Sequence, residues 1–176
     1  MSDFLTDVET LRSRARAKMD DGPITDAYGA DRHKVIDVLN EALATEIVCY
    51  LRYKRHYFTA EGMNAGSAQA EFLEHATQEL QHSDWLAARI TQLQGEPNFN
   101  PVDLASRSHA EYKVGTDLVD MVKEDLVAER VAIQSYQEIV QWLGTKDPTS
   151  RRLFEQILAV EEEHADDLLG LLQEMS

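Results

Sequence analysis

The stretches Glu79-Leu80-Gln81-His82 and Glu161-Glu162-Glu163-His164 have the same form, and each lies within a long amphipathic segment. A residue and the third one after it lie on one face of an α-helix, so each stretch presents a carboxylate beside an imidazole. Two further segments carry a single glutamate, Glu46 or Glu129, in the middle of an apolar helical stripe. Burying a carboxylate without a partner is costly, and four in one layer repel one another. The pattern therefore predicts a helical bundle with a positive charge among these side chains.

The few Gly and Pro residues stand where these helices are expected to end. Gly62, Gly95 and Gly144 close three of the long segments, with Gly95 as the first residue beyond its helix. Asp147-Pro148 has the form of an N-cap followed by a proline in the first turn. These signals predict long helices at about residues 31–60, 65–94, 116–144 and 147–176, and a short one at 3–20.

The lengths of the connections predict how the helices are arranged. Short connections join the first long helix to the second and the third to the fourth, which makes each pair antiparallel. Residues 96–115 form a long connection that can cross the length of a bundle. We therefore expect an all-α chain with a ferritin-like four-helix bundle and one long crossover. The bundle is expected in residues 31–176, after an N-terminal helix and loop in residues 1–30.

The composition limits the class of protein. With 176 residues, of which 43% are hydrophobic, the chain suits one domain with a substantial core. Its 32 acidic and 17 basic residues give a net charge of −15, which disfavours a general nucleic-acid surface. One cysteine excludes an intrachain disulfide and a Cys-rich metal site. Without a signal peptide at the start or an apolar run of membrane-spanning length, a cytoplasmic protein with no membrane partner is expected.

Six side chains make up the candidate metal site. A carboxylate from each of two helices and a Glu-x-x-His pair from each of the other two are the ligand set of di-iron carboxylate bundles. Surface ion pairs are the alternative interpretation, but all six residues interrupt inward-facing apolar stripes. Two Fe²⁺ ions would also balance the four carboxylate charges. The expected ligands are Glu46, Glu79, His82, Glu129, Glu161 and His164.

Over about residues 32–172 the sequence resembles the ferritin-like superfamily, in particular its bacterioferritin and Dps-like branches. The stretch Leu39-Asn40-Glu41-Ala42-Leu43-Ala44-Thr45-Glu46-Ile47-Val48 is similar to the first-helix motif of bacterioferritins, as is Tyr53 later on the same face. Glu79-Leu80-Gln81-His82-Ser83-Asp84, followed by Gly95-Glu96-Pro97-Asn98, is similar to the second-helix motif and the turn after it. Asp125-Leu126-Val127-Ala128-Glu129 and the second Glu-x-x-His pair complete the set. The resemblance implies the same six ligands, with Glu79 and Glu161 bridging two iron ions in each subunit.

Some features depart from the bacterioferritin pattern. Leu80 stands where bacterioferritins have a methionine that ligates an inter-subunit haem, which argues against haem. The chain ends just after the fourth long helix, and its N-terminal helix and long crossover are similar to those of 12-subunit Dps-like shells. The resemblance therefore implies a homo-oligomeric shell of 12 subunits, with 24 as the alternative. Dps-like proteins with such a site often carry two cysteines near it, whereas this chain has Cys49 alone.

The resemblance implies a ferroxidase, which oxidises Fe(II) to Fe(III) with O₂ or H₂O₂ for iron storage and detoxification in a hollow shell. Two alternatives stay open: a non-storage di-metal oxidase or peroxidase, similar to rubrerythrin or manganese catalase, and a DNA-protecting protein of the Dps type. Acidic residues surround the basic residues of the N-terminal segment, so DNA binding is not expected. The basic residues are Arg12, Arg14, Arg16 and Lys18.

Further side chains on or near the inward stripes could serve the site. Asp125, one turn before Glu129, could accept a hydrogen bond from a metal-bound histidine, or could face solvent. Tyr53 could supply an electron or a hydrogen bond, or could be a core residue. His75 could assist the site or the uptake of iron, or could pack in the core or an interface. Cys49 is expected to be a small buried apolar residue.

Overall fold

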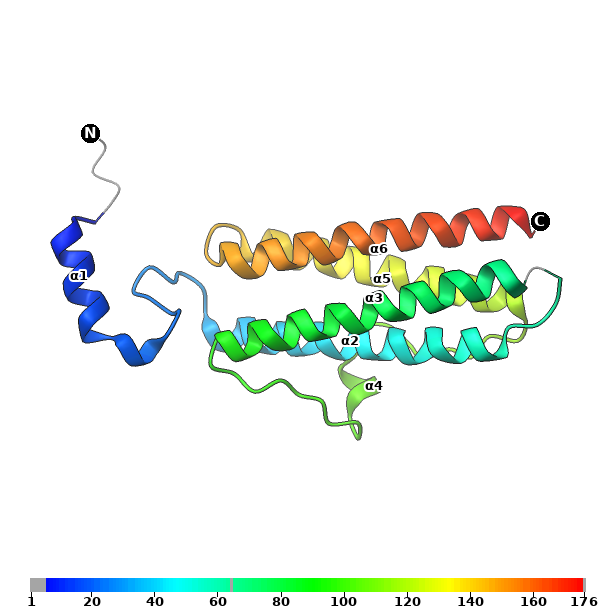
Figure 1. The fold of residues 1–176 in the computed structure, drawn as a ribbon, viewed down its shortest axis with the longest axis horizontal. Coiled ribbons are helices and arrows are strands. Elements are labelled where there is room, and N and C mark those ends of the chain that lie inside the picture. Colours follow the sequence, from blue (N-terminus) through cyan, green and yellow to red (C-terminus); the bar gives the residue numbers. More distant parts are fainter. Residues whose placement is uncertain (1–5, 64, 176) are drawn as a thin grey trace.

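The computed structural model describes residues 6–63 and 65–175, and within these ranges every regular element is a helix (Figure 1). The helices are α1 (Val8–Ala17), the short 3₁₀ helix η1 (Met19–Asp21), α2 (Arg32–Thr59), α3 (Ala65–Gln92), α4 (Leu104–Arg107), α5 (Leu118–Leu143) and α6 (Pro148–Glu174). The all-α prediction is confirmed, and the four long helices begin and end within about two residues of the predicted positions. The predicted start of the short N-terminal helix, at residue 3, lies outside the described residues.

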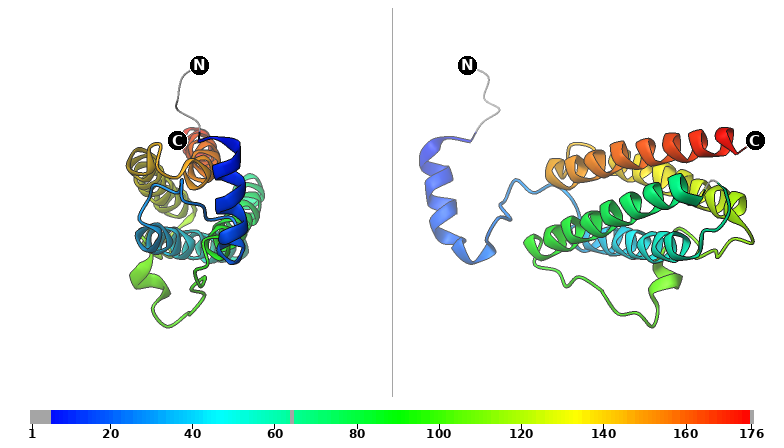
Figure 2. Two further views of the ribbon diagram at one scale, coloured as in Figure 1. Left: turned by 90° about the vertical axis from the view of Figure 1, so that its left-hand side faces the viewer. Right: turned by 45° about the vertical axis from the view of Figure 1, so that its right-hand side comes forward.

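The long helices form two antiparallel pairs, α2 with α3 and α5 with α6 (Figure 1). Between α3 and α5 the chain runs back along the outside of α2, against which α4 packs, so the long crossover is confirmed. Helix α1 stands beyond the end of the bundle at which α2 begins, and none of its residues is buried (Figure 2). No helix in the described part of the chain has the length and apolar character needed to cross a membrane.

Aspartate side chains determine where three of the long helices begin. Asp31, Asp117 and Asp147 each accept a hydrogen bond from the backbone N–H three residues further on. These bonds satisfy backbone donors that have no partner inside the first turn of a helix. The N-cap and proline predicted at Asp147-Pro148 are therefore confirmed.

The end of α3 differs from the prediction in one residue. Gln94, not Gly95, adopts the left-handed backbone conformation, with φ of 60°. Its N–H bonds to the carbonyl of Thr91, and the N–H of Gly95 bonds to the carbonyl of Ile90, both at 2.9 Å, as in a Schellman motif. Packing is what requires glycine at position 95, because a Cβ there would lie 2.9 Å from Cγ2 of Ile36.

Two apolar clusters enclose the layer of ionisable residues from both ends of the bundle. One cluster lies near the start of α2 and includes Leu39, Ile90 and Phe154, all fully buried. The other lies near the end of α2 and includes Phe72 and Leu168, also fully buried. The six predicted ligands lie between the two clusters and are themselves buried. This position shields their charges from water, which strengthens every electrostatic interaction among them.

We expect Gly95→Ala to destabilise the protein by about 1–3 kcal/mol, the usual cost of overpacking a filled core. The added Cβ would lie 3.0 Å or closer from β-branched side chains of both Ile36 and Ile90, which have little freedom to move. Thermal unfolding followed by circular dichroism measures the effect.

Gly170→Ala is the matched control, because its Cβ would meet no atom within 4 Å. Alanine is the better helix former, so this change should stabilise α6 by about 0.5–1 kcal/mol. A Gly95→Ala variant as stable as the Gly170→Ala variant would contradict the packing argument.

Candidate metal centre

All four long helices contribute to one buried cluster, here called the metal centre. Helix α2 supplies one glutamate, α5 supplies another, and α3 and α6 each supply a Glu-x-x-His pair. Each of the six residues is at most 1% exposed. The metal centre consists of Glu46, Glu79, His82, Glu129, Glu161 and His164. The structure therefore brings together all six residues that the sequence predicts as ligands.

The centre divides into two overlapping sets of four residues. In each set, one donor atom from every residue lies within 4.8 Å of the others. One set adds Glu46 and His82 to the pair Glu79 and Glu161, and the other adds Glu129 and His164 to the same pair. Glu79 and Glu161 belong to both sets, which is the arrangement that two bridging ligands would require. Their bridging of two iron ions, which the resemblance implies, stays a prediction.

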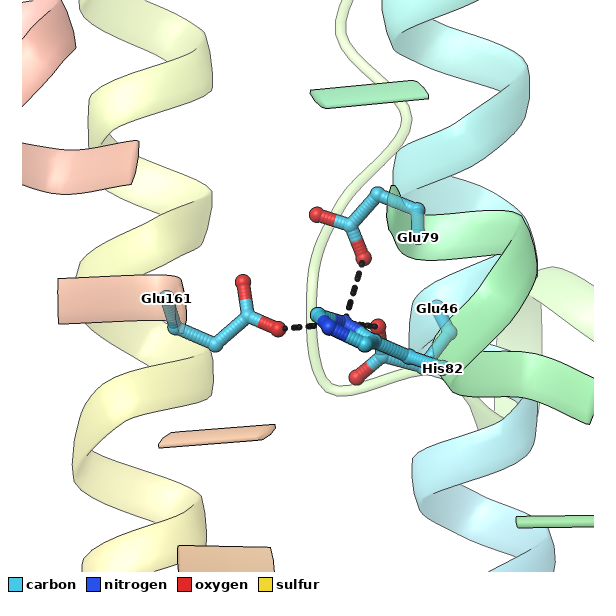
Figure 3. Close-up of side chains that lie close together, drawn as sticks. All are labelled: Glu46, Glu79, His82 and Glu161. Atoms are coloured by element: carbon cyan, nitrogen blue, oxygen red, sulfur yellow. Dashed lines mark hydrogen bonds and ion pairs between the residues drawn. The ribbon is translucent and has the colours of Figure 1, made fainter. Parts of the chain in front are cut away.

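The first set surrounds His82 with carboxylates from different helices (Figure 3). Its Nδ1 atom lies 3.1 Å from Oε2 of Glu46 and 3.0 Å from Oε1 of Glu161. Figure 3 shows Glu161 reaching His82 from the side opposite the helix that carries Glu79. In the second set, Nδ1 of His164 lies 3.3 Å from Oε2 of Glu161 and 3.8 Å from Oε2 of Glu129.

Several donor atoms of the centre are buried without a hydrogen-bond partner. They are Oε1 of Glu79, Oε2 of Glu129, both carboxylate oxygens of Glu161 and Nδ1 of His164. Native proteins rarely leave buried polar atoms unpaired, and a bound ion is one of the standard reasons. Carboxylate oxygens and imidazole nitrogens suit Fe²⁺ and similar divalent ions. The residues present therefore fit a pair of metal ions.

Burial and neighbouring charges raise the pKa of some glutamates of the centre and lower the pKa of another. Burial, together with the charges of Glu161 and Glu46, raises the pKa of Glu79 well above its ordinary value. Burial and the charges of Glu46 and Glu129 raise the pKa of Glu161 to about 7. Burial would also raise the pKa of Glu129, but the nearby His164 and the hydrogen bond from Tyr53 outweigh this effect and lower the pKa to about 2.

The two histidines of the centre hold their protons more tightly than a histidine in water. Burial alone would lower the pKa of His82, but the carboxylates of Glu161 and Glu46, which both lie close to its Nδ1 atom, outweigh this effect and raise the pKa to about 9. In the same way, Glu129 and Glu161 raise the pKa of His164 to about 10. Protons on these imidazoles therefore supply the positive charge that the four carboxylates need when no metal is bound.

Two tyrosines hold the carboxylates that come singly from α2 and α5. The Tyr53 hydroxyl donates to Oε1 of Glu129, and the Tyr136 hydroxyl donates to Oε1 of Glu46. Each tyrosine stands seven residues after the glutamate on its own helix and bonds to the glutamate of the other helix. Tyr53 was predicted as a candidate, with a hydrogen bond as one of its roles. Tyr136 is not among the predicted site residues, although its spacing from Glu129 repeats that of Tyr53 from Glu46.

Asp125 is correctly placed on the inward stripe but has a different partner from the predicted one. Its Oδ1 accepts from Nε of Arg52 at 2.6 Å, and its Oδ2 lies 2.8 Å from Nδ1 of His56. All three side chains are fully buried. Four residues correspond to about 6 Å along a helix, so Asp125 faces a different turn of α2 from Glu129. It therefore neutralises a buried arginine and does not contact either histidine of the centre.

The ring nitrogen of His164 that points away from the centre bonds to a glutamine outside the six residues of the centre. Nε2 of His164 lies 2.6 Å from Oε1 of Gln78, one residue before Glu79 on α3. An amide oxygen at this position accepts the N–H and leaves Nδ1 free to face the centre. Cys49 is buried, as expected, and burial raises the pKa of its thiol.

Comparisons with known proteins agree with the ferritin-like fold. A family model described as a ferritin-like domain matches residues 36–176. The bacterioferritin of Brucella melitensis is 32% identical over 138 residues, which cover 77% of this chain and 80% of that relative.

Two solved structures are similar as well. A dodecameric thioferritin from Bacteroides fragilis, which is a bacterioferritin-related protein, is 35% identical, with a TM-score of 0.81 over 84% of this chain and 89% of that chain. The bacterioferritin of Desulfovibrio desulfuricans, which has a diiron site, is 25% identical, with a TM-score of 0.72 over 82% of this chain and 81% of that chain.

We expect the metal-free protein to lose thermal stability between pH 7 and about pH 9.5. The folded-state pKa values of His82 and His164, about 9 and about 10, lie above the ordinary value of 6.5. Protonation of these residues therefore stabilises the fold fully below pH 6.5, and this stabilisation is lost as the pH rises through the folded-state values. Thermal unfolding of chelator-treated protein across this range measures the effect.

A zinc-loaded sample is the control, because metal ions then replace the protons as the source of positive charge. Its melting temperature should fall much less over the same range. A metal-free melting temperature that stays constant or rises would contradict this account of the charge balance.

Proposed function

Because the chain belongs to the ferritin-like domain family, we propose that it is a ferroxidase, which oxidises Fe(II) to Fe(III) at the metal centre. The observation that carries the proposal is the pair of overlapping ligand sets that share Glu79 and Glu161. Two metal ions held close together can take part in the same redox step, which one isolated ion cannot do. The bacterioferritin relatives, one of which has a diiron site, support this interpretation.

Fe(II) is the substrate, and O₂ or H₂O₂ is the proposed oxidant. Each Fe(II) supplies one electron, so a pair can reduce O₂ to H₂O₂, or H₂O₂ to water, with the protons taken from solvent. The chain holds the carboxylates in place through Tyr53 and Tyr136 and orients His164 through Gln78. The apolar clusters at both ends keep bulk water away from the buried ligands. This enclosure preserves the strong electrostatic binding of the metal ions.

The assembly that we propose is a hollow homo-oligomeric shell of 12 subunits, with 24 as the alternative. The dodecameric relative from Bacteroides fragilis supports the smaller number. Within each subunit, residues 31–176 would form the bundle domain, and residues 1–30 would extend from it. We do not include haem, because Leu80 stands at the position of the expected haem ligand and has no donor atom.

Three of the four basic residues named in the N-terminal segment pair with acidic residues of that segment, which argues against a DNA-binding role. Arg12 pairs with Glu9 at 2.6 Å, and Arg14 and Lys18 both pair with Asp26. These exposed ion pairs reduce the positive surface potential that would attract the phosphates of a DNA backbone. The proposal therefore gives iron oxidation precedence over DNA protection.

Glu129→Ala should abolish the rapid oxidation of the first two Fe(II) per chain, with a loss of more than about 100-fold in rate. The change removes a carboxylate that only one of the two ligand sets contains. Stopped-flow absorbance after mixing metal-free protein with Fe(II) in air, and separately with H₂O₂, measures the fast phase.

Glu163→Ala is the matched control, because Glu163 lies on α6 between Glu161 and His164 in sequence but is exposed. It should keep the wild-type rate. Fast oxidation in the Glu129→Ala variant at the wild-type rate would exclude the proposed centre as the site of reaction.

Storage in a shell predicts a large assembly that accumulates many iron ions per chain. Light scattering gives the mass in solution, and iron analysis after gel filtration gives the loading. About 12 or 24 chains with more than the two irons of the centre support storage. A dimer that retains only two metal ions per chain would instead support a non-storage di-metal enzyme.

A further inference from the structure

A third histidine lies directly beside the metal centre without belonging to it. His75, one turn before Glu79 on α3, is 1% exposed. Its ring stacks on that of His164, with centroids 3.9 Å apart and planes 23° apart. The function of the centre, as proposed above, does not use this side chain.

The hydrogen bonds around His75 leave one of its nitrogens free. The Tyr53 hydroxyl gives its proton to Glu129, so its oxygen can accept from Nδ1–H of His75, 3.3 Å away. A neutral imidazole that donates from Nδ1 carries a lone pair on Nε2. Nε2 of His75 is buried and has no hydrogen-bond partner. It is therefore available as a ligand.

This free nitrogen faces two carboxylates from different helices. Nε2 of His75 lies 3.7 Å from Oε2 of Glu71 on α3 and 3.6 Å from Oδ2 of Asp167 on α6. Metal–ligand bonds of about 2.0–2.3 Å place neighbouring ligands roughly 3–4 Å apart, so these separations suit a shared ion. One donor atom from each of the three residues lies within 4.8 Å of the other two.

The cluster also connects the surface to the interior. The side chains of Glu71 and Asp167 are 35% and 46% exposed, whereas His75 is buried. Burial, together with the nearby negative charges of Asp167 and Glu74, raises the pKa of Glu71. A divalent cation between Glu71 and Asp167 would offset these charges.

We propose that Glu71, His75 and Asp167 form a third metal site, which takes a divalent cation such as Fe(II) from solvent and holds it before it enters the metal centre. The mixed oxygen and nitrogen donors suit Fe²⁺, Mn²⁺, Co²⁺ or Zn²⁺. The stacked rings of His75 and His164 separate this third site from the centre. Binding of a cation at the third site does not depend on the proposed ferroxidase function, whereas the supply of Fe(II) to the centre rests on that function.

Zn²⁺, which is redox-inert, tests binding separately from oxidation. We expect metal-free full-length protein to bind about three tight Zn²⁺ per chain, and Asp167→Asn to bind about two, in calorimetric titration. Asp167 is partly exposed and the change keeps its size, so the fold should be retained. Glu71→Gln should weaken the third site by about tenfold, the usual effect of losing one charged partner.

Glu163→Gln is the control for nonspecific loss of negative charge and should retain all three sites, because Glu163 is an exposed residue one turn before Asp167 on α6. Wild-type protein that binds only two Zn²⁺, or an Asp167→Asn variant that still binds three, would overturn the third site.

Glu129→Ala should keep third-site binding while it impairs the centre. If the protein binds a third Zn²⁺ but oxidises no Fe(II), the ferroxidase function and the supply role are refuted. The third site as a cation-binding site is then still supported.

The supply role has its own kinetic test. With Asp167→Asn, the rate of oxidation at limiting Fe(II) should fall by about tenfold, while the rate at saturating Fe(II) stays unchanged. Glu163→Gln should change neither rate. An Asp167→Asn variant with the wild-type rate at limiting Fe(II) would show that the third site does not supply the centre.

Discussion

Repulsion among four buried carboxylates is the constraint on which the rest of this structure depends. Glu46, Glu79, Glu129 and Glu161 share one layer of the bundle, where no bulk water screens their charges. Protons on His82 and His164 balance part of this charge, and metal ions can replace the protons. The apolar clusters on both sides hold the layer together even though the layer itself opposes folding.

The two halves of the centre are related by a repeated spacing. A tyrosine seven residues after the glutamate of α2 holds the glutamate of α5, and the converse bond joins Tyr136 to Glu46. These crossed bonds tie the two helix pairs to each other at the level of the ligands. A second buried polar layer, in which Asp125 neutralises Arg52 and contacts His56, lies further along α2 and one turn earlier on α5. The bundle thus combines a candidate metal site with internal charge balance.

Much of the fold and of the centre could be predicted because both depend on patterns along single helices. Aspartate caps, apolar stripes and Glu-x-x-His spacing are local properties, and they located the long helices and the six residues of the centre. The partners of Asp125, Gln78 and His75 could not be predicted in the same way. Each depends on the axial offset between two helices, and a shift of one turn exchanges one set of neighbours for another.

The sequence by itself determined which residues face the interior and which of them carry charge, because helical periodicity follows from the backbone. Only the tertiary structure decided which atoms meet: Tyr136 with Glu46, Asp125 with Arg52, and His75 with the ring of His164. The packing of side chains between helices sets the axial offsets that bring these atoms together. The same packing requires glycine at position 95, because the side chain of Ile36 approaches the backbone there.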